Sequence, residues 1–326
     1  MVKVTTDFSG GETIATTKTR LEAILDYWLG TSSTSGVSTW GDLRTLLNSV
    51  APSVVTIADG ELASVFRPKI NSLNDPDGII SSTLFGSSEQ GVWYDPSDLS
   101  TLFQDTAGTT PVTTAGQTVG LMLDKSGNDL DATQATAAAR PTYQTDGTYH
   151  WLSFDGVDDF MVTPTITPSI DKAQVFSGQH CNNNTGFQIV AELSTSSDSN
   201  SGSFRLERNT TSHGYQIGNV AARILRRTVD SAPTTDVVNI NFDYASGGSV
   251  DSRLNGVQSE WTTVVLNTLP AINFGNYPMY IGARAGLNSF FNGNIYSLVT
   301  RFGANLEAST IETTEKYVAG KTGVDL

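Results

Sequence analysis

Asp155, Asp158 and Asp159 form the closest acidic cluster in the sequence, within the segment FDGVDDFM. Calcium prefers several oxygen ligands supplied by loops, so these three carboxylates could form a site for a hard cation. Asn288 and Asn292 could add carbonyl oxygens if their loop lies at the same end of the fold. The alternative is turn chemistry, because Asp and Asp-Gly stabilise tight turns by bonding their own backbone. A calcium site and a structural turn both stay open at the level of sequence.

Aromatic side chains near turns are the second group that could bind a ligand. Sugars are bound by exposed aromatic rings that stack on the pyranose, with amides and carboxylates nearby to fix the hydroxyl groups. The candidate carbohydrate-binding residues are Tyr277, Phe290, Phe291, Trp261 and Asn255. The loop 286–293 is the best place to look for such a ligand. Core packing is the alternative for each ring.

Enzyme signatures are missing from the sequence. It contains no Gly-x-Ser-x-Gly, His-Glu-x-x-His, phosphate-loop or Gly-x-Gly-x-x-Gly motif. Glycosidases built on a β-sandwich place two carboxylates a few ångströms apart, usually at a spacing of two along one strand. Glu192, Glu207 and Glu260 have no such neighbours. We therefore predict a protein without enzymatic activity.

The elements that must position these residues are mostly strands. From residue 187 onward apolar and polar residues alternate, with a new strand about every ten residues, which predicts a sandwich of about twelve strands or more. Residues 142–162 contain two strands around a tight Asp155-Gly156 turn. Two further strands are expected at 279–284 and 294–302, joined by a short loop. In the second, Tyr296, Leu298 and Phe302 share one face, and Ile295 and Val299 share the other.

Helices are expected at the two ends of the chain. Apolar stripes predict helices at 12–29 and from residue 39 to Pro52, and a final helix at 306–319 that ends at Gly320. Residues 74–78 read as a turn, and the Ser/Gly-rich run 81–91 reads as a linker. The sequence is therefore divided into a helical assembly region, residues 1–90, and a β-sandwich, residues 91–326.

Charge and cysteine usage exclude several classes of function. The formal net charge of −14 repels phosphate backbones and anionic membranes, so nucleic-acid binding and membrane insertion are not expected. Arg223, Arg226 and Arg227 are expected to line an edge strand. The single cysteine, Cys181, allows no internal disulfide and favours synthesis in a reducing cytoplasm. The N-terminus lacks an apolar stretch, so no secretion signal is expected.

Several short motifs together resemble known families. The segments YIG (280–282) and FNGNI (291–295) resemble the last strands of the concanavalin A-like or laminin-G-like sandwich. The ordered set WYDPSDLSTLFQD, GLMLDKSGN, ARPTY, FDGVDDFM and GKTGVDL resembles a module that recurs in tailed-bacteriophage structural proteins. The resemblance covers about residues 91–326. Each motif alone is short, and the shared order gives the resemblance its specificity.

The resemblance implies a mainly β fold, a concanavalin A-like (laminin-G-like) antiparallel sandwich with a small helical N-terminal region and a C-terminal helix. It also implies a virion protein on the particle surface: a tail fibre, head fibre or capsid decoration. The N-terminal region would anchor an oligomer of identical chains to other virion proteins, and the sandwich would adhere to host glycans. Such a protein is made in the host cytoplasm and released by lysis. A purely architectural cement protein and a glycan depolymerase are the alternatives.

Overall fold

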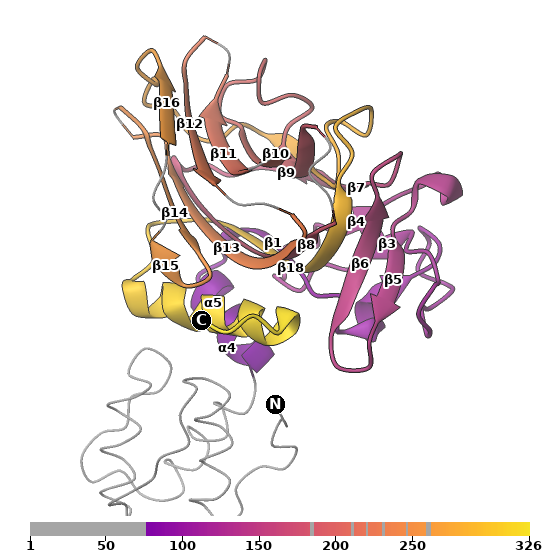
Figure 1. The fold of residues 1–326 in the computed structure, drawn as a ribbon. Coiled ribbons are helices and arrows are strands. Elements are labelled where there is room, and N and C mark those ends of the chain that lie inside the picture. Colours follow the sequence, from indigo (N-terminus) through magenta and orange to yellow (C-terminus); the bar gives the residue numbers. More distant parts are fainter. Residues whose placement is uncertain are drawn as a thin grey trace, which may run out of the picture.

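Two antiparallel sheets pack face to face in the computed structural model, which describes residues 76–182, 186–209, 212–219, 221–229, 232–245, 247–258 and 262–326 (Figure 1). The expected mainly β sandwich is confirmed. The helices expected within residues 1–75, and the candidates Trp261 and Glu260, lie outside the described residues. Within the described part no helix is long and apolar enough to cross a membrane.

Sheet I has eight strands and carries the helices on its outer face. In spatial order they are β15 (Val257–Gln258), β14 (Ser249–Leu254), β13 (Thr234–Asp243), β8 (Lys172–Cys181), β18 (Asn292–Phe302), β6 (His150–Asp155) and β5 (Thr142–Thr145), with β1 (Gln90–Tyr94) also paired to β18.

Sheet II has ten strands. In spatial order they are β16 (Thr262–Leu266), β12 (Arg223–Val229), β11 (Ser212–Gly218), β10 (Phe204–Asn209), β9 (Gln188–Leu193), β17 (Tyr277–Ile281), β7 (Met161–Ile166), β4 (Ala132–Thr133), β3 (Leu121–Met122) and β2 (Leu102–Phe103). Two short 3₁₀ helices, Leu99–Thr101 and Ala137–Ala139, interrupt the connections.

The main core lies between the sheets and is rich in aromatic rings. Phe204 of β10 stacks on Phe242 of β13 with ring centroids 5.0 Å apart, and Phe274 meets Phe204 edge-on at 6.1 Å. These rings join the two sheets, because Phe204 and Phe242 come from opposite layers. Large rings in contact across the layers contribute both buried apolar area and favourable ring geometry.

A second apolar layer explains why sheet I strands are apolar on both faces. The helices α4 (Pro76–Phe85) and α5 (Ala308–Thr322) cover the outer face of sheet I (Figure 1). Phe176 of β8 packs beneath the helices, whereas its neighbour Val175 points into the main core. Residues at alternate positions thus serve different layers, as the pleat of a strand requires.

Three expectations for this region were wrong. Residues 76–78 and 81–85, expected as part of a turn and of a linker, belong to α4, whose Leu84 is buried against the sandwich. The C-terminal helix runs beyond Gly320 and ends at Gly323, which has the left-handed φ of 77° that favours glycine. An apolar surface supplied by sheet I stabilises these turns of helix, and the local sequence does not reveal it. The division into residues 1–90 and 91–326 stays a prediction.

The two strands around Asp155-Gly156 do not form a hairpin. β6 pairs with β5 and β18 in sheet I, whereas β7 pairs with β17 and β4 in sheet II. The turn therefore carries the chain from one layer to the other. β17 and β18 are separated in the same way, so the loop between them also crosses the rim of the sandwich.

A bulge changes which side chains of β18 share a face. The register against β8 shifts between Ile295 and Ser297, so Tyr296 is an extra residue. Ile295 consequently points into the main core with Leu298 and Phe302, whereas Val299 lies under the helices. The expected grouping of Tyr296 with Leu298, and of Ile295 with Val299, was wrong, because a bulge reverses the alternation of a strand.

Candidate functional site

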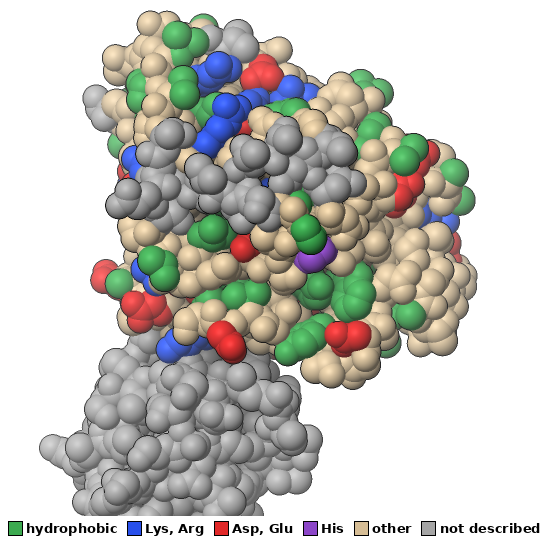
Figure 2. Space-filling view, in the orientation of Figure 1, with side chains coloured by type: hydrophobic (Ala, Val, Ile, Leu, Met, Phe, Trp, Pro, Cys, Tyr) green, Lys and Arg blue, Asp and Glu red, His purple; other side chains and the backbone are tan. Residues whose placement is uncertain are grey.

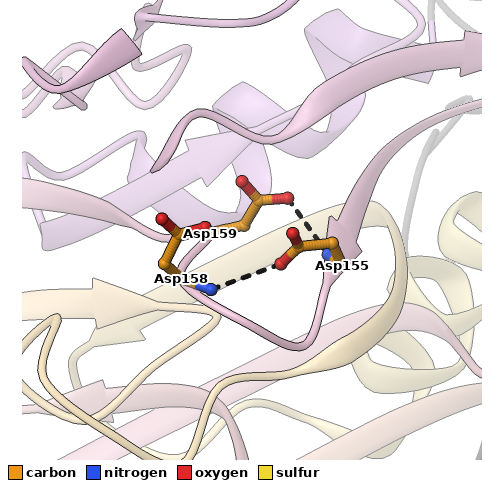
Figure 3. Close-up of side chains that lie close together, drawn as sticks. All are labelled: Asp155, Asp158 and Asp159. Carbon is orange, nitrogen blue, oxygen red and sulfur yellow. Dashed lines mark hydrogen bonds between the residues drawn. The ribbon is translucent and has the colours of Figure 1, made fainter. Parts of the chain in front are cut away.

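The acidic turn after β6 brings together the three aspartates that the sequence singled out. One carboxylate oxygen from each of Asp155, Asp158 and Asp159 lies within 4.8 Å of the others (Figure 3). Asp155 is exposed, Asp158 is half-buried and Asp159 is buried. The spacing is compatible with one cation held between the carboxylates.

Hydrogen bonds within the turn also give it a structural role. The amide of Asp155 donates to Oδ2 of Asp159 at 3.0 Å. The amides of Val157 and Asp158 donate to Oδ1 of Asp155 at 2.7 and 3.3 Å. Side-chain oxygens that accept from amides two and three residues ahead stabilise a tight turn. The turn interpretation thus has direct support, and calcium binding stays a prediction.

Electrostatics make Asp159 the unusual member of the cluster. Burial, together with the negative charges of Asp155 and Asp158, raises the pKa of Asp159 to about 7. Burial disfavours the charged form, and like charges at this distance add to the cost. Near neutral pH the Asp159 carboxyl is therefore partly protonated. A cation bound between the three carboxylates would reduce the repulsion among them.

The loop 286–293 lies beside this turn, as the calcium interpretation requires. Asn292 is paired with Asp155 across β18 and β6, and its Cβ would lie 2.7 Å from a Cβ added to Gly156. Its Oδ1 accepts from Nδ2 of Asn182 at 2.9 Å. Oδ1 of Asn288 accepts from the Ser289 hydroxyl at 2.9 Å. The two loops thus share one rim, with both amide oxygens already engaged in a hydrogen bond.

The expected sugar-binding residues do not converge on one surface. Phe291 is fully buried and packs against Phe154 with centroids 6.2 Å apart, so the core alternative holds for it. Phe290, half-buried, follows the loop after β17, whereas Tyr277 opens that strand at its other end. Of the described candidate rings, Phe290 and Phe291 belong to the loop beside the acidic turn, and Phe290 is the one of the two that is partly exposed.

Tyr277 and Asn255 are engaged in structural contacts. The Tyr277 hydroxyl donates to the carbonyl oxygen of Ser201 at 3.0 Å, and its ring packs against the main core. Asn255 has a left-handed φ of 51° between β14 and β15. Its Oδ1 accepts from the amide of Val237 at 2.8 Å, and its Nδ2 donates to Asp236 at 3.1 Å. Both side chains stabilise the fold where sequence reasoning expected sugar contacts.

A buried ion-pair network on sheet II was not visible in the sequence. Glu192 accepts from Nε of Arg284 at 3.0 Å, and Glu207 pairs with Nε of Arg205 at 2.6 Å. Asp198 bridges both arginines, at 2.6 Å to Arg205 and 2.8 Å to Arg284. An acid–base pair of a glycosidase needs one protonated carboxyl. Carboxylates each bound to a guanidinium form instead a structural network.

An open groove lies on the outer face of sheet II. Its volume is about 750 Å³, within the range of small-ligand sites. A row of side chains paired across four strands forms its floor: Phe103 of β2, Leu121 of β3, Thr133 of β4 and Val162 of β7. Their strand neighbours Leu102, Met122, Ala132 and Met161 point into the main core. Alternation along the strands therefore places the row on the outer face.

Polar groups surround this apolar floor. Asp129 and Asp131 line the groove, and Thr106 adds a hydroxyl group. The loop that carries Thr106 is held by Asp105, whose Oδ1 accepts from the amides of Ala107 at 2.9 Å and Thr109 at 3.1 Å. None of the described lining residues is Lys, Arg or His. The groove thus combines one half-buried aromatic ring with carboxylates and hydroxyls.

Sequence reasoning missed this groove, although it noted the segment WYDPSDLSTLFQD that contains Phe103. Its floor comes from four short strands, three of them only two residues long. A two-residue strand has no period to detect. The signal that was present is the pair Asp129 and Asp131 beside the Ser-Gly-Asn turn.

Comparisons with known proteins gave structural neighbours only. No protein-family model matches this chain, and no curated protein matches it. Among solved structures, it is similar to a botulinum neurotoxin type C structure whose report describes cell entry that depends on two ganglioside molecules. That similarity has a TM-score of 0.47 and 10% identity, over 71% of this chain and 51% of the other.

Two further neighbours are binding domains of other botulinum neurotoxins. One is the binding domain of botulinum neurotoxin DC in complex with rat synaptotagmin II, with a TM-score of 0.48 and 11% identity over 73% of this chain and 52% of the other. The other is the receptor-binding domain of botulinum neurotoxin type G, with a TM-score of 0.45 and 11% identity over 60% of this chain and 48% of the other. The chain spans about half the length of these structures. The function must therefore be argued from the chain's own residues.

Proposed function

We propose that this chain is a non-enzymatic surface protein of a bacteriophage particle, and that its sandwich adheres to neutral host glycans through the groove over β2, β3, β4 and β7. The observation that carries the binding proposal is the row from Phe103 to Val162, an apolar floor with carboxylates beside it. Sugars present the same combination, an apolar C–H face and a rim of hydroxyl groups.

The chemistry of the lining favours a neutral sugar over an acidic one. The Phe103 ring offers a stacking surface for pyranose C–H groups, and Asp129 and Asp131 offer acceptors for hydroxyl donors. One oxygen of Asp131 already accepts from the amide of Asp124 at 2.8 Å, which fixes the orientation of that carboxylate. No cation lines the described groove, and the chain carries a charge of −14, so sialic or uronic acids would be repelled.

The place on a phage particle is supported by sequence, through the shared order of motifs from WYDPSDLSTLFQD to GKTGVDL. The single cysteine agrees with synthesis in a bacterial cytoplasm and release by lysis. Residues 1–90 would anchor the chain to other virion proteins as an oligomer. Several copies would strengthen adhesion, because linked sites bind a multivalent surface more tightly than single ones.

A glycan array with the full-length protein tests the binding proposal. We expect neutral glycans to bind and acidic ones to be rejected. Phe103→Ala should weaken binding on the order of tenfold, because the loss of a stacking ring costs about 1.4 kcal/mol of binding free energy. Phe290→Ala is the matched control, because Phe290 is also half-buried but lies outside the groove. An array that stays blank with and without calcium would refute adhesion.

Two other measurements address the rest of the proposal. Electron cryomicroscopy of purified particles should show density for this chain on the outer surface; density confined to joints between shell subunits, with a blank array, would support the architectural cement role. Release of reducing ends from host polysaccharide would establish a depolymerase. The pairing of Glu192 and Glu207 with arginines argues against that last outcome.

A further inference from the structure

The groove over β2, β3, β4 and β7 lies at the acidic end of sheet II. Its four strands contain no charged residue, and the loop between β3 and β4 places Asp129 and Asp131 beside them. Asp131 is half-buried, whereas Asp129 is exposed. No Lys, Arg or His is among the described lining residues. Two negative charges in a groove without cations attract a ligand that carries positive charge.

The basic side chains of sheet II lie at a distance from this groove. β10 carries Arg205 and Arg208, and β12 carries Arg223, Arg226 and Arg227. In the spatial order of the sheet, β9 and β17 separate these strands from β7. Figure 2 shows a group of Lys and Arg side chains near the top of the molecule, where Figure 1 places β10, β11 and β12. The charge of the sheet is therefore divided between its two ends.

The loop between β3 and β4 does not neutralise the two carboxylates that line the groove. Its lysine, Lys125, binds elsewhere: Nζ lies 2.7 Å from Oδ2 of Asp77 and 2.8 Å from Oδ2 of Asp98. Neither Asp129 nor Asp131 forms an ion pair with any residue that the structure describes. Both charges are therefore available to a ligand.

Hydrogen bonds hold one of these carboxylates and leave oxygen atoms of both for a ligand. Oδ1 of Asp131 accepts from the amide of Asp124 at 2.8 Å, which fixes the side chain, and Oδ2 has no hydrogen-bond partner among the described residues. The Asp129 carboxylate has no such partner either. An ammonium group has three N–H donors and no acceptor, so it complements these oxygens.

The floor of the groove also favours a cation with an apolar body. Phe103 is half-buried and supplies the aromatic ring of the floor. The face of an aromatic ring carries negative potential and attracts ammonium groups. Leu121 and Val162 lie in the same row and provide aliphatic contact. A sugar ring that carries an amine presents both parts, an apolar C–H face and an ammonium group.

We propose that the groove prefers glycans with free amino groups, such as hexosamines that are not N-acetylated. This inference rests on the proposed glycan binding and narrows its ligand class. Acidic sugars are rejected, neutral sugars bind, and sugars that carry an ammonium group bind most tightly. N-acetylation converts the amine into an uncharged amide, so it removes the attraction to Asp129 and Asp131 while the sugar ring keeps its contacts with the floor.

Two oligosaccharides that differ only in N-acetylation test this preference. Chitotetraose carries a free amine on each ring, and tetra-N-acetylchitotetraose carries none. Each is titrated into the full-length protein by isothermal titration calorimetry at about pH 6, where amines are protonated. Salt at about 0.15 M screens the field of distant charges. We expect chitotetraose to bind about fivefold more tightly, which corresponds to one partly exposed ion pair.

Two variants assign the preference to the groove. Asp131→Asn removes one charge and keeps an acceptor for the Asp124 amide. Asp129→Asn removes the other charge, and Asn tolerates the left-handed φ of 56° at this position. Each variant should reduce the preference to about twofold, and the double variant should abolish it. Asp325→Asn is the matched control, because it removes an exposed carboxylate near the end of the chain and should keep the full preference.

Each failure has its own outcome. Equal binding of the two oligosaccharides by wild type would overturn the preference and leave the proposed glycan adhesion intact. No binding of chitotetraose would also overturn the preference, whereas adhesion itself is refuted only by a blank glycan array. A preference that Asp325→Asn reduces as much as Asp131→Asn would overturn the inference too, because the total charge of the protein would then be its cause.

Discussion

The amide of Asp155 donates a 3.0 Å hydrogen bond to Oδ2 of Asp159, at the point where the chain leaves sheet I for sheet II. Burial raises the pKa of Asp159 to about 7, together with the repulsion between its carboxylate and those of Asp155 and Asp158. One pair of residues thus stabilises the turn through a backbone bond and makes it sensitive to pH.

Replacing Asp159 should remove this sensitivity. The folded pKa of about 7 lies above the ordinary 3.8, so between these values the folded state binds more protons than the unfolded chain. The contribution of Asp159 to the free energy of unfolding therefore falls as pH rises through that window. Asp159→Asn keeps an acceptor for the Asp155 amide. Its melting temperature should exceed that of wild type at pH 8 but not at pH 4, and each kcal/mol of added stability corresponds to about 2–4 °C.

Thermal melts from pH 4 to pH 8 provide the measurement, with Asp325→Asn as the control because Asp325 is an exposed carboxylate near the end of the chain. Identical pH profiles for wild type and Asp159→Asn would contradict the role of Asp159. The same melts separate the two interpretations of the turn. A calcium site predicts a rise in wild-type melting temperature with calcium that Asp159→Asn loses; a structural turn predicts no rise in either protein.

Filling the groove should block glycan binding without unfolding the protein. Thr133 lies in the centre of the floor, between Leu121 and Val162, and its side chain is half-buried. Thr133→Trp adds a ring where the sugar would lie, so we expect binding on the array to fall by at least about tenfold. Ser309→Trp, exposed on α5, is the control, and equal binding by both variants would place the sugar elsewhere.

Gly293 should not tolerate a side chain. A Cβ added there would overlap with the carbonyl oxygen of His180 and the ring of Phe291. The backbones of β18 and β8 pair at this position, so neither can move away without breaking the ladder. We expect Gly293→Ala to lower the free energy of unfolding by about 1–3 kcal/mol in urea denaturation. Asn294→Ala, at the next position, where the side chain is half-buried, should lower the free energy of unfolding clearly less. Equal losses for the two variants would show that the close approach of the β18 and β8 backbones at Gly293 is unimportant.

Lys321 should be needed to hold α5 on the sandwich. Its Nζ lies 2.9 Å from Oδ2 of the fully buried Asp95, which also accepts from the Tyr317 hydroxyl at 2.9 Å. Burial alone would raise the pKa of Asp95, but Lys321, together with Ser97 and Lys125, outweighs it and the pKa is lowered. The stability from this pair is therefore present above the ordinary pKa of Asp and is lost as pH falls.

Lys321→Met should leave Asp95 buried with a weaker partner, Lys125, at 3.8 Å. We expect a loss on the order of 3 kcal/mol at pH 7, measured by urea denaturation, and a smaller loss at pH 3, because acid favours neutralising the buried Asp95 once Lys321 is gone. Lys316→Met on the same helix is the control and should have little effect. A loss that is the same at both pH values would contradict the assignment to Asp95.

The sequence by itself determined the kind of fold and several local features. Alternation of apolar residues predicted the strands from β9 onward, and the sandwich that contains them is confirmed. The C-terminal helix was predicted within a few residues of its bounds. The turn at Asp155-Gly156 was also predicted, because turns and strands depend on residues close together in the chain.

Tertiary structure alone decided the sheet of each strand and the surfaces that strands share. β6 and β7 are neighbours in sequence but lie in different sheets. Phe103 and Val162 line the same groove although they are 59 positions apart in the sequence. A single extra residue, Tyr296, exchanged the faces of β18, and α4 formed because Leu84 has sheet I to pack against. The pattern within a strand gives its period but not its partner. Partners are selected by packing between distant segments, and so are the sites those segments form.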